Sequence, residues 1–334
     1  MNSHLPPLFR TLTAPGPNSG TGLTLNGVVF PVSADFHLGK DEQGRPVVVI
    51  RVPSPTAVGL PPVELENLRV DHLAHCRILQ ASGREIEDKF SVIRCLSYDH
   101  SLQEYFLNTM EEIATALAPR ITAATISSAI HKLAELFQAL TRPPSRPLQG
   151  LWAELFVIRS SRDQSRLLRA WHSEAEERFD FGLDDQRLET KCSSTRDRRH
   201  HFSLEQAQPS AGLHVLIASL FVEGQTNGLT LGRLWDEIRD FAGGETELAM
   251  KIERVCCSAL GASWNKAREK AFDEKLARES LAFYDAADIP RVSRAQPMGV
   301  TDIRFCSDLS RVKPINIKEF ENDGSLFAAC PLVR

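Results

Sequence analysis

A predicted β-hairpin spans residues 178–191, which read Arg178-Phe179-Asp180-Phe181, Gly182-Leu183-Asp184-Asp185-Gln186 and Arg187-Leu188-Glu189-Thr190-Lys191. Side chains alternate along a strand, so Glu189 and Lys191 share one face of the second strand. Gly and Asp in the middle segment tolerate turn geometry, and the turn brings Asp180 back beside Glu189. The pattern therefore predicts that two carboxylates and an ammonium group lie close together.

Two carboxylates and a lysine are suited to phosphodiester hydrolysis. The negative charge of a phosphodiester repels a nucleophile, so an enzyme needs a divalent cation held by oxygen ligands and a group that helps to form hydroxide. The ammonium group of Lys191 can stabilise charge that develops on the phosphate. The alternative without a catalytic role is a solvated strand face, because an acid followed by Glu-x-Lys recurs by chance in charged sequences.

A helix that is apolar on nearly every side is predicted at residues 150–158, where Glu154 is the only charged residue. On a helical wheel Glu154 falls between Val157 and Ile158, so its carboxylate points into packed surroundings. An unpaired charge is costly there. Its partner is either a metal or an amide cluster, or else a salt bridge or cap contact with a neighbouring loop.

A short helix and a buried strand are predicted downstream of the hairpin. Ser203 and Gln206 have the spacing of a capping box, a role that could by itself explain Gln206. Residues 213–222 are almost continuously apolar, as in a central strand covered on both faces. The predicted order is therefore helix, hairpin, helix, buried strand.

These motifs resemble those of the PD-(D/E)XK nuclease superfamily, and more narrowly a bacterial family of PD-(D/E)XK motif proteins found with restriction and phage-defence genes. The resemblance covers residues 150–222 and implies an α/β (mixed α+β) fold with a restriction-endonuclease-like core, a mixed sheet flanked by helices. Phe179 stands where the motif's name has proline.

The resemblance also implies roles for individual residues. Asp180 and Glu189 would be metal ligands, together with the Thr190 carbonyl and, as a further candidate, the first-helix acid Glu154. Lys191 would be the motif lysine that orients or deprotonates water, and Gln206 a supporting polar residue. The expected cofactor is Mg²⁺, with Mn²⁺ as the alternative, and the expected reaction is DNA cleavage that leaves a 5′-phosphate.

A basic segment follows the hairpin and contains Arg196, Arg198, Arg199, His200 and His201. Basic side chains beside a metal site would neutralise phosphates, so these residues are predicted to bind the DNA backbone. The alternative is a solvated loop whose arginines pair with acids such as Asp184 and Asp185.

Composition limits the classes of function. The net charge of -4 gives no global attraction to nucleic acid, so DNA binding would be local, which argues against a non-specific DNA coat protein. Seven scattered cysteines fit a reducing cytosol. Neither a signal peptide nor a membrane-spanning segment is evident, so a cytoplasmic location is expected.

Three regions are predicted along the chain: a β-rich N-terminal domain with a following helix at 1–122, the nuclease-like core at 123–240, and a C-terminal α+β region, with a winged-helix-like form as one reading, at 241–334. The clearest break is the proline-rich segment 142–147, but the amphipathic helix before it is expected to pack on the sheet of the core.

Two functions of other classes stay open. One is a non-catalytic nuclease-fold subunit that binds DNA or a partner within a defence complex, and the other is a structural or DNA-binding protein in which Glu189 and Lys191 form a surface salt bridge. Motifs for ATP hydrolysis are lacking. Expected partners are therefore DNA, a methyltransferase or a helicase/ATPase, and a second copy of the chain as a homodimer.

Overall fold

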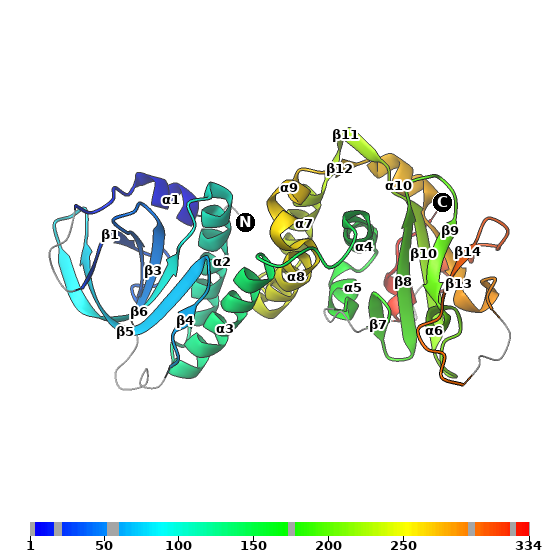
Figure 1. The fold of residues 1–334 in the computed structure, drawn as a ribbon, viewed down its shortest axis with the longest axis horizontal. Helices are drawn as coiled ribbons and strands as arrows, with labels where there is room; N and C mark the ends of the chain where they lie inside the picture. The colour runs from blue at the N-terminus through cyan, green and yellow to red at the C-terminus, as the bar shows by residue number, and fades with distance from the viewer. Residues whose placement is uncertain are drawn as a thin grey trace. The chain divides into compact units, whose positions relative to one another are not determined.

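The computed structural model describes residues 4–16, 22–51, 60–172, 178–292, 298–320 and 325–333 (Figure 1). The chain divides into two compact units, residues 1–141 and 142–334. The division falls at the start of the proline-rich segment 142–147, the clearest break in the sequence.

The first unit contains a six-stranded sheet with the strand order β1-β2-β3-β6-β5-β4. Its strands are β1 (Leu23–Val29), β2 (Phe36–Lys40), β3 (Pro46–Arg51), β4 (Val63–Glu64), β5 (Leu68–Leu79) and β6 (Glu85–Cys95). The neighbours in this order are antiparallel, and β1 also pairs in parallel with β5, so the sheet closes on itself. The prediction of a β-rich N-terminal region is confirmed, and its sheet is mainly antiparallel.

Three helices accompany this sheet in the first unit: α1 (Leu5–Thr11), α2 (His100–Leu117) and α3 (Ala123–Ala139). The side chain of Asp99 caps α2 and that of Thr122 caps α3, and these caps fix where the two helices begin. The prediction placed α3 in the nuclease-like core. It is assigned instead to the first unit, where its apolar stripe is buried.

The second unit is built around a mixed sheet with the order β13-β10-β8-β7. Its strands are β7 (Phe181–Leu183), β8 (Gln186–Ser193), β10 (His214–Phe221) and β13 (Ala282–Asp285). β7 and β8 form the predicted hairpin, with Asp184 at φ 49° in its turn, whereas β8 and β10 are parallel and pair Glu189 with Ile217. The buried strand predicted at 213–222 is β10.

The helix α4 (Leu148–Ser160) packs against β8 and is buried along residues 151–158 (Figure 1). Around it lie α5 (Gln164–Ala170), α7 (Leu231–Asp240) and α8 (Thr246–Leu260). Complete burial explains why this helix is apolar on nearly every side. The prediction of a buried helix that carries Glu154 is therefore confirmed.

A second layer contains β9 (Arg199–Ser203), α6 (Leu204–Ala207), the 3-10 turn η2 (Ala286–Asp288) and β14 (Arg304–Asp308). Phe202 of β9 and Ile217 of β10 share a hydrophobic core with Tyr284 and Leu309. β13 joins the main sheet and β14 pairs with β9. Residues 241–334 therefore complete the fold of the second unit, which corrects the predicted separate, winged-helix-like region.

The remaining elements of the second unit are β11 (Gly224–Thr230), η1 (Gly261–Ser263), α9 (Trp264–Arg268), β12 (Ala271–Phe272), α10 (Glu274–Ser280), η3 (Ile317–Phe320) and α11 (Leu326–Ala329). β11 and β12 form a separate antiparallel pair. Within the described ranges, each helix is too short or too polar to cross a membrane.

Candidate active site

Asp180 stands directly before β7 and is held against β8. Its Oδ2 accepts a hydrogen bond from the backbone N–H of Thr190 at 2.6 Å. His172 fixes the backbone on the other side, because its N–H donates to the Asp180 carbonyl at 2.8 Å and its Nδ1 bonds the Phe179 carbonyl at 2.6 Å. The imidazole approaches so closely that a Cβ at Gly182 would lie 2.6 Å from its Nε2.

Glu189, Lys191 and Gln206 form a closed triangle of hydrogen bonds. The Nζ of Lys191 donates to Glu189 Oε1 at 2.6 Å and to Gln206 Oε1 at 3.2 Å. Gln206 Nε2 donates to Glu189 Oε1 at 2.8 Å. Gln206 also forms the predicted capping box with Ser203, so it both caps α6 and holds the acid and the lysine.

Glu154 approaches this cluster from α4 and is itself paired. Its Oε2 accepts a hydrogen bond from the indole N–H of Trp171 at 2.8 Å, and Arg146 Nη1 lies 3.3 and 3.2 Å from its two carboxylate oxygens. The salt-bridge alternative of the sequence analysis therefore describes the contact found here. Arg146 belongs to the proline-rich segment.

The three acids repel one another electrostatically. Burial raises the pKa of Glu189 to about 7, and the nearby charge of Asp180 adds to that shift. Burial and the charge of Asp180 likewise raise the pKa of Glu154 to about 8, although Arg146 and Trp171 oppose the change. The pKa of Asp180 is also raised by burial, against the opposing effects of the Thr190 N–H and of Lys191. Such a cluster attracts cations.

The oxygen atoms of this cluster are suited to a divalent cation. Glu189 Oε2 is buried, finds no hydrogen-bond partner in the described part of the chain, and lies in a cluster of repelling carboxylates. Within the described ranges no three His, Cys, Asp or Glu side chains are arranged to hold a metal by themselves. Asp180, Glu189 and the Thr190 carbonyl would thus provide a partial set, which suits Mg²⁺ because that ion usually takes one or two carboxylates plus water and substrate phosphate.

The basic segment divides into interior and exposed residues. Arg198 donates to the Ser219 carbonyl at 3.0 Å and hydroxyl at 2.8 Å and also bonds the Ser280 carbonyl. His200 is buried and bonds the Ser219 hydroxyl at 2.8 Å, and burial lowers its pKa to about 4. These two residues hold β9 against β10, so the predicted DNA-binding set is corrected to its exposed members.

The exposed members are Arg196, Arg199 and His201. Arg196 pairs with Glu223 at 2.8 Å and Arg199 with Asp197 at 2.9 Å. Exposed ion pairs of this kind contribute little to stability, so phosphates could compete for both arginines. The prediction that the segment contacts DNA stays a prediction for these three residues.

We expect Arg198→Ala to lower the free energy of unfolding by about 2–4 kcal/mol, because it removes the charged donor that bonds the carbonyls of Ser219 in β10 and Ser280 in α10. Arg199→Ala is the matched control, because Arg199 is the next residue in the sequence and its side chain is 65% exposed. It should change stability by less than about 0.5 kcal/mol. Urea unfolding measures both values, and equally small losses would contradict an interior role for Arg198.

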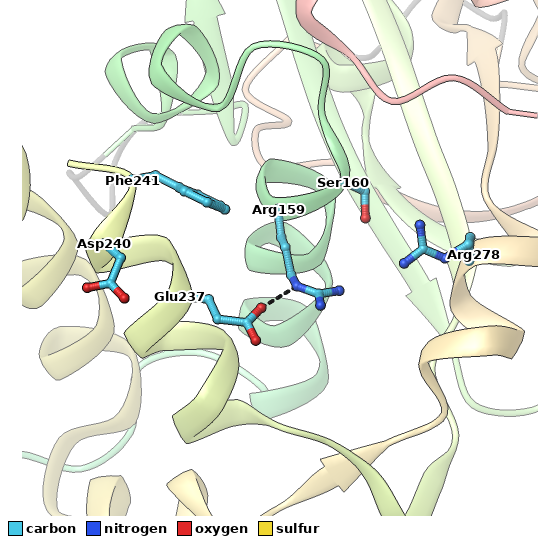
Figure 2. Close-up of a pocket in the computed structure, with 6 residues that line it drawn as sticks. All are labelled: Arg159, Ser160, Glu237, Asp240, Phe241 and Arg278. Carbon is cyan, nitrogen blue, oxygen red and sulfur yellow. Dashed lines mark hydrogen bonds and ion pairs between the residues drawn. The ribbon is translucent and has the colours of Figure 1, made fainter. Parts of the chain in front are cut away.

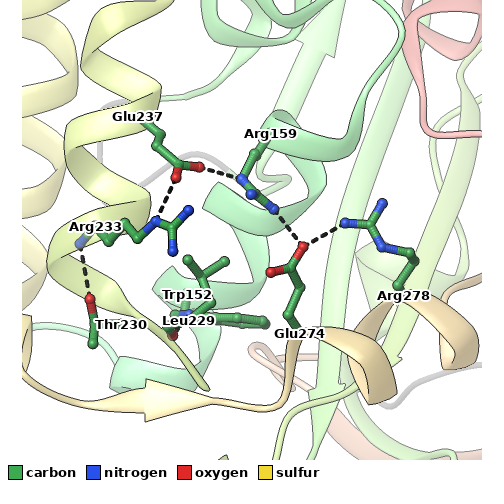
Figure 3. Close-up of polar contacts among 8 residues, drawn as sticks. All are labelled: Trp152, Arg159, Leu229, Thr230, Arg233, Glu237, Glu274 and Arg278. Atoms are coloured by element: carbon green, nitrogen blue, oxygen red, sulfur yellow. Dashed lines mark hydrogen bonds and ion pairs between the residues drawn. The ribbon is translucent and has the colours of Figure 1, made fainter. Parts of the chain in front are cut away.

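Two cavities lie away from these acids. One, of about 410 Å³, is lined by Arg159, Ser160, Glu237, Asp240, Phe241 and Arg278 (Figure 2). The other, of about 630 Å³, is lined by Glu274, Lys275, Arg278, Glu279, Leu281 and Leu332. The arginines of the first cavity are neutralised by carboxylates: Arg159 bonds Glu237 and Glu274, and Glu274 also bonds Arg278 at 2.6 Å (Figure 3). This charge ladder connects α4, α7 and α10, and we assign it a structural role.

Three contact residues of the cluster were missed by sequence reasoning: Arg146, Trp171 and His172. Arg146 is visible as a charge in a proline-rich segment, but its pairing with Glu154 depends on how that segment folds onto α4. Trp171 and His172 follow α5 without any motif spacing. Their roles arise from the bridge between Trp171 and Phe181, which places both residues beside Asp180.

A mixed sheet with Asp180 directly before β7 and with Glu189 and Lys191 on β8, together with a buried acid on α4, is the arrangement expected of a PD-(D/E)XK nuclease. A protein-family comparison agrees: the model described as "Putative PD-(D/E)XK family member (DUF4420)" matches residues 7–310. The chain belongs to this family, and the match includes most of both units. Searches of curated proteins and of solved structures gave no significant match.

Proposed function

We propose that this protein is a Mg²⁺-dependent DNA endonuclease, with Mn²⁺ as an alternative cofactor. The observation that carries the proposal is the convergence of Asp180, Glu189 and Lys191, in which Glu189 Oε2 has no hydrogen-bond partner among the residues that the structure describes. A buried, unpaired carboxylate oxygen is costly unless a cation or proton takes it up. Membership of a PD-(D/E)XK family supports nuclease chemistry at this cluster.

Each residue has a distinct role in this proposal. Asp180, Glu189 and the Thr190 carbonyl would hold the cation, which when bound supplies positive charge at the phosphate and lowers the pKa of water. Lys191 stabilises the charge that develops on the phosphate and orients the attacking water. Gln206 fixes the positions of Glu189 and Lys191, and Arg196, Arg199 and His201 contact the DNA backbone.

The proposed biological setting is a prokaryotic restriction or phage-defence system in the cytoplasm. A methyltransferase or a helicase/ATPase is a partner suited to such a role, and a homodimer would allow both DNA strands to be cut. These assignments extend the nuclease proposal and depend on it.

A non-catalytic, nuclease-fold subunit of a defence complex is the second candidate. It is favoured by the burial of Glu189 and Glu154, each 5% exposed. A catalytic site must admit a phosphate, whereas a binding subunit can keep the cluster closed.

The test is cleavage of supercoiled and linear phage DNA, unmodified and methylated, with Mg²⁺, with Mn²⁺ or with EDTA. Wild type is compared with Asp180→Asn and with Asp184→Asn, a matched control for an exposed acid in the hairpin turn. Metal-dependent cutting that is lost only in Asp180→Asn supports the nuclease. A folded wild type that neither cuts DNA nor binds metal favours the non-catalytic subunit.

A further inference from the structure

We propose that Arg146 is a positioning residue that keeps Glu154 out of the metal-ligand set. This inference rests on the proposed metal-dependent nuclease and concerns the same cluster. It assigns a role to the proline-rich segment 142–147, which in the sequence marks only a break between regions.

The first observation is that the Glu154 carboxylate is already occupied. Arg146 Nη1 contacts both of its oxygens, at 3.3 and 3.2 Å, and the Trp171 indole takes Oε2 at 2.8 Å. The Glu154 side chain is 6% exposed and that of Arg146 is 27% exposed. Breaking a charge-assisted contact in such a buried place costs free energy, because water does not fully replace the lost hydrogen bonds. Glu154 would have to break its contact with Arg146 before it could bind a cation.

The second observation is that the backbone carrying Arg146 is fixed. Ser145 donates its N–H to the Ala259 carbonyl at 3.1 Å and its hydroxyl to the Ser258 carbonyl at 2.9 Å. The N–H of Ala262 donates to the Arg142 carbonyl at 2.8 Å. The segment is thus attached to the C-terminal end of α8, and Pro143, Pro144 and Pro147 restrict its backbone further.

The attachment also depends on a close approach at Gly261, which has φ 50°. A Cβ at this position would lie 2.1 Å from the Arg142 carbonyl oxygen and 2.8 Å from the Pro143 carbonyl carbon. The segment therefore packs closely against η1, and the backbone that carries the Arg146 side chain has a defined position. This placement suits a positioning residue better than a mobile DNA contact.

Charge in the cluster is consistent with this role. Three carboxylates, Glu154, Asp180 and Glu189, face two cations, Lys191 and Arg146. With Arg146 and Trp171 bonded to its oxygens Glu154 is occupied, and the cation is left to Asp180 and Glu189.

The test is a double-mutant cycle on Mn²⁺ affinity, measured by calorimetry with the full chain, using wild type, Arg146→Ala, Glu154→Gln and the double variant. Release of Glu154 as an extra charged ligand should tighten Mn²⁺ binding about 10-fold or more in Arg146→Ala, because affinity for a hard cation rises with the number of charged oxygen ligands. In the Glu154→Gln background the same change should alter affinity by less than about threefold, because the residue on which Arg146 acts is gone. Arg146→Lys should restore most of the wild-type affinity.

Two controls separate the explanations. Arg233→Ala removes an arginine that is 69% exposed and pairs with Glu237, so it reports the effect of net charge alone and should leave Mn²⁺ affinity unchanged. An equal effect of Arg146→Ala in both backgrounds, or weaker Mn²⁺ binding, overturns the inference while the metal site stands. Absence of Mn²⁺ binding to folded wild type overturns the proposed metal site itself, and the inference with it.

Discussion

Lys191→Ala is expected to lower the rate of DNA cleavage about 10²- to 10⁴-fold without abolishing metal binding. Its ammonium group lies 2.6 Å from Glu189 Oε1 and is the one cation in direct contact with the proposed ligands within the described ranges. Removing it deletes a charge that acts on the developing phosphate charge, but it leaves both carboxylates in place. Single-turnover cleavage and Mn²⁺ titration of the same preparation measure the two effects.

Glu189→Gln is the comparison variant, because it separates the loss of a proposed metal ligand from the loss of the Lys191 charge. The amide replaces a proposed ligand with a neutral group, so both Mn²⁺ binding and cleavage should be lost. Gln206 bonds both Glu189 and Lys191 and holds them in position. Gln206→Ala should therefore lower the rate of cleavage less than Lys191→Ala or Glu189→Gln does. If Lys191→Ala cut DNA at the wild-type rate, Lys191 would be a structural partner of Glu189, as in the alternative of a simple salt bridge.

The parts of the site that the sequence predicted follow local rules. Alternation along β8 places Glu189 and Lys191 on one face, and the turn at Asp184 and Asp185 returns Asp180 to the same strand. The capping box at Ser203 and the apolar helix around Glu154 likewise depend only on spacing within one element. Interactions of short sequence separation are readable because the geometry of one element determines them.

The parts that were missed depend on contacts between distant segments. Arg198 was read as a surface charge, yet its partners Ser219 and Ser280 are 21 and 82 residues away. The predicted boundary at residue 241 was wrong for the same reason, because β13 pairs with β10 and β14 pairs with β9. The position of α3 and the pairing of Arg146 also depend on packing that no periodicity encodes.

In metal-free buffer the contribution of Glu189 to the free energy of unfolding should fall as the pH rises from about 4.5 to about 7 and level off above that range. Burial and the charge of Asp180 raise the pKa of Glu189 to about 7 in the folded protein, whereas an exposed glutamate titrates near 4.5. Between these values the folded state holds a proton that the unfolded state has lost, so each increase in pH favours unfolding. The loss attributable to Glu189 is on the order of 3 kcal/mol when the pH has passed its folded pKa.

Urea unfolding of wild type and Glu189→Gln in EDTA, between about pH 5.5 and pH 8.5, isolates this contribution from those of other titrating groups. The variant should have the shallower slope and be the more stable protein above neutrality, because it also relieves repulsion with Asp180 and Glu154. Mn²⁺ should reduce the slope in wild type, since a cation binds the deprotonated carboxylates of the folded state only. Parallel pH profiles for the two proteins would mean that Glu189 is not strained by its neighbours, and the electrostatic argument for a cation at this cluster would fail.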